Sequence, residues 1–157
     1  MQLKRVVVTG LGALSPIGND AQTFWQNLLE GKSGAADITK FDASDFKTRF
    51  ACEVKDFEPL NFIDKKEMRR LDTFSQYALV CSDEAIADAR LNDKSIDKDR
   101  VGVIWSSGIG GLLTFQEQIE AYSKRKEAGK NTARFNPFFI PKMILDIASG
   151  HISIKHG

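Results

Sequence analysis

Few residues of the chain are of types that do nucleophilic or metal chemistry. Its 157 residues include two cysteines, Cys52 and Cys81, with no CxxC spacing and no histidine at a metal-ligand interval. Cys52 lies in an alternating, strand-like run and Cys81 on the apolar stripe of a helix, so packed thiols are favoured over reactive ones. This cysteine usage indicates a reduced, cytosolic compartment, and nothing in the pattern calls for a metal or a cofactor.

The two histidines, His151 and His156, both lie within the last seven residues. Neither belongs to a recognisable nucleophile motif. His151 shares a helical face with Ile144, Ile147 and Ala148, which favours a packed, hydrogen-bonded imidazole over a catalytic one. No catalytic residue is therefore assigned within the chain.

Two glycine-rich turns follow strand-like segments and raise the question of a nucleotide site. Gly10-Leu11-Gly12 matches the opening of a dinucleotide fingerprint, but Ser15 stands at the third glycine position and the helix begins only near Asn19. Neither this turn nor the one at 108–111 carries Gly-Lys-Ser/Thr, which excludes a P-loop. Backbone flexibility where a strand becomes a loop explains both turns. A dinucleotide-dependent oxidoreductase remains as an alternative.

Short strands and helices are expected to position these groups. β-branched or alternating runs predict strands at 5–9, 50–54 and 101–105, the first of them covered on both faces in a parallel sheet. Asn19 is the expected N-cap of the first helix, which Gly31 ends, and Asp64 with Glu67 has capping-box spacing for the second. The expected helices span 19–31, 64–90, 112–129 and a stretch that starts at Pro141.

The third of these helices is expected to be amphipathic, with Leu112, Phe115, Ile119 and Tyr122 on its buried side. Its basic end, 124–126, is typical of a helix C-terminus, where the dipole favours cations. The following segment, 136–141, contains two prolines and is predicted to be an extended loop.

The overall composition sets limits on function. The chain is 42% hydrophobic and 27% charged, typical of a globular α/β protein, and its 22 basic and 21 acidic residues give a net charge of +1. This balance is unlike that of a nucleic-acid binder, so charge-based recognition must be local. No apolar run approaches the length of a signal-peptide core or a membrane span, so neither export nor membrane insertion is expected.

The order of short motifs resembles that of the β-ketoacyl-acyl-carrier-protein synthases. The resemblance begins with the runs at 5–12 and 15–18 and continues through 41–42, 66–72, 107–111, 136–141 and 148–151 at compatible spacing. It is a resemblance to the elongating type found in bacterial type II fatty-acid synthesis. A thiolase-like α/β fold is implied, in which mixed five-stranded sheets pack on helices in two similar halves, and the full-length enzyme is implied to be a homodimer.

The resemblance also implies a reaction, the decarboxylative condensation of an acyl thioester with malonyl-acyl carrier protein. In this family a cysteine at a helix N-terminus takes the acyl group, and two histidines polarise the malonyl thioester. These residues would follow Gly157, and His151 and His156 do not correspond to them. Residues 1–157 are thus expected to be the N-terminal part of the first half-domain, inactive and poorly stable alone.

Binding residues, by contrast, are expected within the chain. Lys66, Arg69 and Arg70 are expected on one helical face that suits an acidic carrier protein, and Arg134 is added on the same reasoning. The alternative is a solvated helix start with a few surface cations.

Two apolar residues are assigned to the acyl chain by the resemblance alone. Ile109 matches a position that gates the acyl pocket, and Phe139 matches one that lines it, often across the dimer. Besides the enzyme and the oxidoreductase, a non-catalytic ketosynthase-like module that binds acyl carrier protein stays open. The residues after Gly157 discriminate between these classes.

Overall fold

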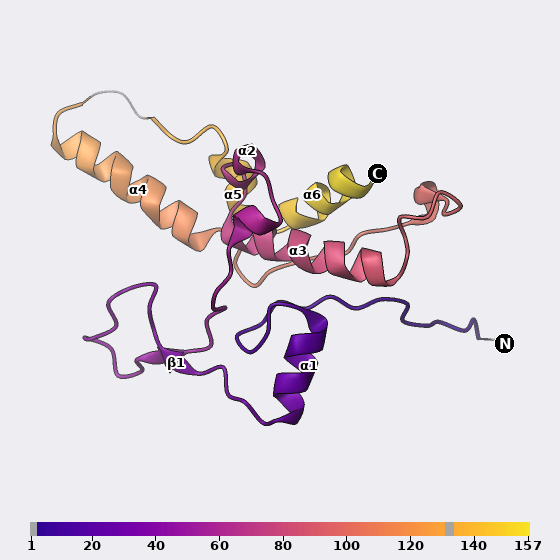
Figure 1. The fold of residues 1–157 in the computed structure, drawn as a ribbon. Coiled ribbons are helices and arrows are strands. Elements are labelled where there is room, and N and C mark those ends of the chain that lie inside the picture. The colour runs from indigo at the N-terminus through magenta and orange to yellow at the C-terminus, as the bar shows by residue number, and fades with distance from the viewer. Residues whose placement is uncertain (1–2, 131–133) are drawn as a thin grey trace. The chain divides into compact units, whose positions relative to one another are not determined.

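The computed structural model describes residues 3–130 and 134–157, and the chain forms two compact units. Unit 1 comprises Met1–Glu58 and Val80–Ile96, and unit 2 comprises Pro59–Leu79 and Asp97–Gly157. Helix α3 (Thr73–Asp88) contributes its first residues to unit 2 and the rest to unit 1 (Figure 1).

Unit 1 contains helix α1 (Ala21–Leu29) and a small antiparallel sheet of strands β1 (Ala36–Asp37) and β2 (Phe50–Ala51). Asp20, and not the predicted Asn19, caps α1, because its carboxylate accepts the backbone N–H of Thr23 at 2.7 Å. This hydrogen bond also lowers the pKa of Asp20. Gly31 ends the helix in the left-handed region, at φ +69°, as predicted.

The regular elements of unit 2 within the described residues are all helices, and this unit holds most of the buried aliphatic side chains. Its core includes Ile63, Leu71, Leu79 and Ile152, all nearly inaccessible to solvent. Besides the start of α3, its elements are η1 (Pro59–Asn61), α2 (Lys65–Met68), η2 (Lys98–Arg100), α4 (Leu112–Glu127), α5 (Phe139–Met143) and α6 (Ile147–His156).

The helix predicted at 64–90 is in fact two helices. Asp64 caps α2 as expected by accepting the N–H groups of Lys66 and Glu67. Asp72 then interrupts the helix, because its carboxylate accepts the N–H of Phe74 at 3.4 Å and so starts α3. The helix predicted from Pro141 is likewise divided: α5 begins before the proline, which its first turn tolerates, and extended backbone at Ile144 separates it from α6. The extended loop predicted at 136–141 is therefore partly helical.

The strands predicted at 5–9 and 101–105 are not formed. Both segments lie outside any sheet, and most of their side chains are exposed, to 89% at Val6 and 99% at Ile104. A β-strand needs neighbours to satisfy its backbone groups, and β1 with β2 is the one sheet within the described ranges. The parallel sheet expected around residues 5–9 is thus absent from the described residues, and the apolar side chains of this segment are uncovered.

Burial predictions failed at two further places. Cys52 is exposed, because β2 ends at Ala51 before reaching it. The apolar side of α4 is also exposed by more than a third at all four positions predicted to be buried: Leu112, Phe115, Ile119 and Tyr122. No helix in the described part of the chain combines the length and apolar character needed to cross a membrane.

Candidate functional site

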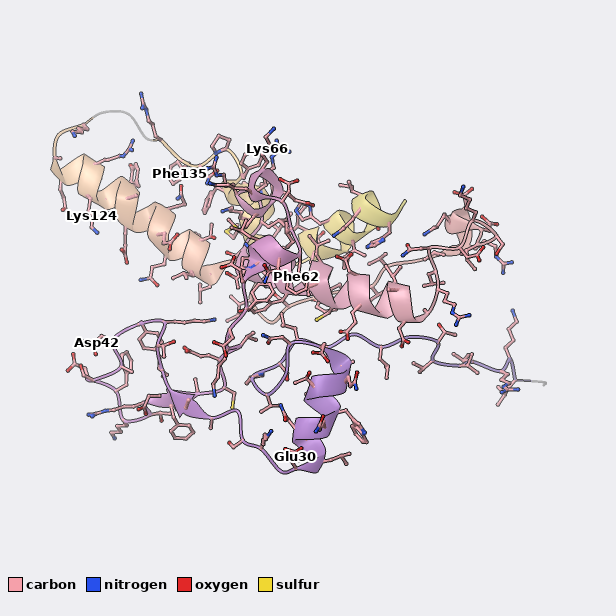
Figure 2. The ribbon with its side chains drawn as sticks, viewed as in Figure 1. Glu30, Asp42, Phe62, Lys66, Lys124 and Phe135 are labelled. Carbon is pink, nitrogen blue, oxygen red and sulfur yellow. The ribbon has the colours of Figure 1, made fainter. Side chains whose placement is uncertain are left out.

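The predicted carrier-binding cations lie in unit 2, around the end of α2. Figure 2 shows Lys66 on this helix; Arg69 is its C-cap, and Arg70 follows in the turn before α3. All three side chains are exposed. Because the helix ends at Met68, they do not form the single helical face that we predicted, and we refer to them as the cationic turn.

Arg70 also contacts an aromatic ring, which the sequence analysis did not predict. Its guanidinium carbon lies 5.3 Å from the centroid of the Phe138 ring, within the range of a cation–π interaction. Phe138 is set by a local turn, in which its N–H donates to the Asn136 side chain at 2.9 Å. The Asn-Pro pair before it was the one sequence signal for this turn. Arg134 is exposed in the same α4–α5 connection, and its role stays a prediction.

An apolar pocket of about 690 Å³ lies in unit 2 beside the start of α4. Ile109 is part of its wall, as the acyl-pocket prediction requires, whereas Phe139 is not. Phe139 stacks instead on Phe115, with ring centroids 6.1 Å apart, and Phe115 does line the pocket. The full lining is Ser106, Ile109, Leu112, Phe115, Met143, Ile144, Leu145 and Asp146.

The glycine-rich turn at 108–111 lets the start of α4 approach the backbone of α5 closely beside this pocket. Gly110 has φ +80°, and its N–H donates to the Ser107 hydroxyl at 2.7 Å. A Cβ on Gly111 would come within 2.3 Å of the Lys142 carbonyl oxygen. The Asp72 carboxylate accepts the Thr114 hydroxyl and so fixes the first turn of α4.

A series of stacked rings continues from the pocket along α4. Phe135 lies 5.7 Å from both Tyr122 and Phe139, and Phe139 continues the series to Phe115. The interplanar angles are 19–25°, so each ring is nearly parallel to its neighbour in the series. These rings partly cover the face of α4 that was predicted to be buried.

His151 lies on α6 in unit 2 and is only partly buried. Its Nε2 is inaccessible and has no hydrogen-bond partner among the described residues, so our prediction of a hydrogen-bonded imidazole is wrong for this atom. Burial lowers the pKa of His151, and the negative charge of Glu67 opposes the shift. Neither catalysis nor metal binding is indicated.

In unit 1, the turn at Gly10-Leu11-Gly12 packs directly on α3. A Cβ on Gly12 would lie 2.0 Å from the Cys81 carbonyl oxygen, and one on Gly10 would lie 2.3 Å from that of Ala85. These glycines therefore serve close packing of two backbones, which explains them better than the flexibility that we predicted.

The N–H groups of this turn are occupied by carboxylates of α3. Leu11 donates to Asp88 at 2.9 Å, and Ala13 donates to Glu84 at 2.8 Å. The other oxygen of Glu84 accepts the N–H of Ala21, the first residue of α1, at 2.8 Å. A pyrophosphate would meet two negative charges in place of free donors, which argues against the oxidoreductase alternative.

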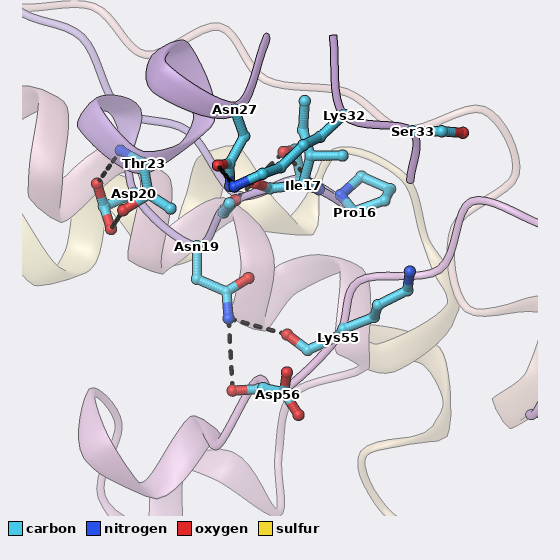
Figure 3. Close-up of a pocket in the computed structure, with 12 residues that line it drawn as sticks. Pro16, Ile17, Asn19, Asp20, Thr23, Asn27, Lys32, Ser33, Lys55 and Asp56 are labelled. Carbon is cyan, nitrogen blue, oxygen red and sulfur yellow. Dashed lines mark hydrogen bonds between the residues drawn. The ribbon is translucent and has the colours of Figure 1, made fainter. Parts of the chain in front are cut away.

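A second pocket, of about 410 Å³, lies in unit 1 beside the start of α1 (Figure 3). Asn19 reaches across it and donates to the carbonyl oxygens of Lys55 and Asp56 at 2.9 and 3.4 Å. Lys32 is already bound to Asn27 and Glu30 at 2.7 and 2.9 Å. The other charged side chains that line this pocket are of both signs, so the pocket does not indicate a particular ligand.

Cys81 is half-buried in unit 1, and burial together with the charge of Glu84 raises the pKa of its thiol. A raised pKa disfavours the nucleophilic thiolate, as predicted from its place on the apolar stripe.

Comparison with known proteins identifies the family. The family model described as "Beta-ketoacyl synthase, N-terminal domain" matches residues 3–157. The 3-oxoacyl-[acyl-carrier-protein] synthase 2 of Synechocystis sp. is 45% identical over the whole chain, and that of Staphylococcus aureus strain COL is 46% identical over 99% of it. The chain spans 36% of the length of each relative.

A solved β-ketoacyl synthase from Burkholderia phymatum STM815 has the same fold. It superposes with a TM-score of 0.73 at 26% identity, over 97% of this chain and 36% of that one. The thiolase-like α/β class predicted from the sequence is thereby confirmed, although the described residues form little of its sheet. The chain belongs to the β-ketoacyl synthase family and matches its N-terminal domain.

Proposed function

We propose that this chain is the N-terminal part of the first half-domain of a 3-oxoacyl-acyl-carrier-protein synthase. The protein condenses an acyl thioester with malonyl-acyl carrier protein, with loss of carbon dioxide, in fatty-acid synthesis. The relatives at 45–46% identity, which carry this name, support the proposal. The structural observation that carries it is the presence of an exposed cationic turn and an apolar pocket within one compact unit.

The cationic turn and the apolar pocket recognise different parts of the substrate. Lys66, Arg69, Arg70 and Arg134 attract the acidic surface of the carrier protein, where opposite charges speed encounter and fix orientation. Ile109 contacts the acyl chain at the pocket wall, and Phe139 supports that wall through its stack on Phe115. An apolar wall suits an alkyl chain because binding removes both surfaces from water.

The covalent step belongs to residues outside this chain. A condensing enzyme needs an activated thiolate, whereas the pKa of the Cys81 thiol is raised and Cys52 does not line the apolar pocket of unit 2. The chain alone is accordingly inactive. The full-length protein is a cytoplasmic homodimer whose partners are acyl carrier protein and the acyl and malonyl thioesters, with no nucleic acid and no membrane.

Charge reversal at the cationic turn tests the carrier-binding role. Changing Lys66, Arg69 and Arg70 together to glutamate in the full-length protein should raise the KM for acyl carrier protein and weaken its salt dependence. Lys94→Glu, an exposed lysine of unit 1, is the matched control and should leave KM close to its original value. Unchanged kinetics in the triple variant would remove the carrier-binding assignment.

Obstruction of the pocket tests the acyl-chain role. Ile109→Phe adds bulk at the wall and should impair long acyl primers more than short ones, measured as kcat/KM over a series of chain lengths. Ile154→Phe on α6, where the native side chain is 82% exposed, controls for the added ring. An equal loss for every primer would point to a folding defect and contradict the assignment.

A further inference from the structure

Arg70 differs from the other members of the cationic turn because it contacts an aromatic ring. Its guanidinium carbon lies 5.3 Å from the Phe138 ring centroid, and no such contact involves Lys66 or Arg69 among the described residues. Asp64, the N-cap of α2, is a charged neighbour: the backbone N–H groups of Glu67 and Lys66 chiefly lower the pKa of its carboxyl, and the charge of Arg70 adds a smaller contribution. A guanidinium over a ring still offers N–H groups at its edge to a carboxylate.

Phe138 in turn belongs to the segment that supports the pocket. The next residue, Phe139, stacks on Phe115 at 6.1 Å, and Phe115 lines the pocket. On the other side, Phe139 is held by Phe135 at 5.7 Å. Arg70 is thus linked to the pocket wall by a cation–π contact, by the peptide bond that joins Phe138 to Phe139, and by a ring stack, all within unit 2.

A second link joins the same two features. Asp72, two residues after Arg70, accepts the hydroxyl of Thr114 on the first turn of α4. That turn carries Leu112 and Phe115, both of which line the pocket. The backbone after the cationic turn is therefore anchored to α4, the helix that carries part of the pocket wall.

We propose that Arg70 is a positioning residue that couples occupation of the cationic turn by a carboxylate-rich carrier protein to the order of the acyl-pocket wall. The inference rests on the proposed function. A carboxylate that binds the edge of the guanidinium holds Arg70 over Phe138, and the ordered Phe138 restrains Phe139 and Phe115. An acyl chain then enters a pocket whose wall is already ordered. Binding of the carrier protein and binding of the acyl chain therefore favour each other.

The test measures the coupling directly in the full-length protein. Dodecanoic acid is the probe for the pocket, and acyl carrier protein without its phosphopantetheine arm is the probe for the cationic turn. Without this arm the carrier protein cannot hold an acyl chain, so the two probes bind independently of any covalent link. Calorimetry gives the Kd of dodecanoic acid with and without saturating carrier protein. We expect the carrier to tighten dodecanoic-acid binding about two- to fivefold, the range expected for an exposed cation–π contact.

Variants distinguish ordering of the pocket wall by Arg70 from electrostatic attraction of the carrier protein. Arg70→Gln and Phe138→Leu should each reduce the coupling factor to about one, and the double variant should reduce it no further. Arg69→Gln is the matched control: it removes a neighbouring exposed charge and weakens carrier binding but should keep the coupling. Because Arg70 is exposed, Arg70→Gln remains informative even if Phe138→Leu impairs folding.

The outcomes are distinguishable. A wild-type coupling factor of one, or a factor that survives Arg70→Gln, overturns the inference while leaving the proposed function intact. Loss of coupling in Arg69→Gln as well as Arg70→Gln means that charge alone is responsible, which also overturns it. Absence of carrier binding to the wild-type protein rejects the proposed carrier role itself.

Discussion

A different kind of interaction stabilises each of the two units. In unit 1, carboxylates of α3 accept backbone N–H groups of the N-terminal segment and of α1, through Glu84 and Asp88. In unit 2, buried aliphatic side chains such as Leu79 and Ile152 form a small core, and a series of stacked rings runs along α4. The stability of unit 1 thus depends on carboxylates that accept backbone N–H groups, whereas the stability of unit 2 depends on close packing of apolar side chains.

This difference predicts which substitutions each unit tolerates. Loss of volume leaves a cavity whose cost grows with its size, so it should affect unit 2 most. Loss of a charged acceptor leaves a backbone donor without its partner, so it should affect unit 1 most.

The largest effect is expected at Leu79, whose side chain is fully buried. Leu79→Ala should lower the free energy of unfolding by about 2–5 kcal/mol, measured by urea unfolding monitored by circular dichroism. Ile154→Ala on α6 removes a side chain that is 82% exposed and should change stability by less than about 0.5 kcal/mol. Equal effects of the two variants would show that unit 2 has no specific core.

An intermediate effect is expected at Glu84. Glu84→Gln keeps the shape but presents an amide N–H₂ to one of two backbone donors, which should cost about 1–3 kcal/mol. Hydrogen exchange should therefore become faster at the Ala13 and Ala21 amides and not in α4. Glu117→Gln, at an exposed position on α4, is the matched control. Unchanged exchange at Ala13 and Ala21 would refute the polar account of unit 1.

The smallest effect concerns protonation of His151 in unit 2. Burial lowers its folded-state pKa below the ordinary value of 6.5, so the folded chain binds fewer protons than the unfolded chain near that pH. Stability is then complete above about pH 6.5 and declines as the pH falls through the folded pKa. Nuclear magnetic resonance titration should give a His151 pKa below 6.5, and Glu67→Gln should lower it further by removing the opposing charge. A His151 pKa above 6.5 would contradict this assignment.

The sequence predicted local features better than long-range ones. The caps at Asp64 and Gly31 and the turn at 108–111 depend on neighbouring residues, and these predictions agree with the structure. The interruption at Asp72 was missed, because a single aspartate between two apolar stretches fits a continuous helix as well as a new N-cap.

Strands and burial were harder to predict, because they depend on partners that periodicity does not identify. The run at 101–105 has strand composition but no sheet neighbour, so Ile104 is almost fully exposed. In the candidate site, the placement of Ile109 at the pocket follows from the family resemblance, and its role stays a prediction. The Arg70–Phe138 contact joins residues 68 positions apart in the chain and had no sequence signal beyond the turn at Asn136.

The close packing of Gly12 on Cys81 has a genetic consequence. Every missense change of a glycine codon introduces a residue with a Cβ, and at this position that atom would lie 2.0 Å from a backbone oxygen. The obstacle is main chain, so no choice of side chain avoids it. In a saturation-mutagenesis library selected for function, the Gly12 codon should therefore be depleted of all missense alleles alike, whereas the Gly102 codon, where a Cβ would meet nothing within 4 Å, should retain small residues.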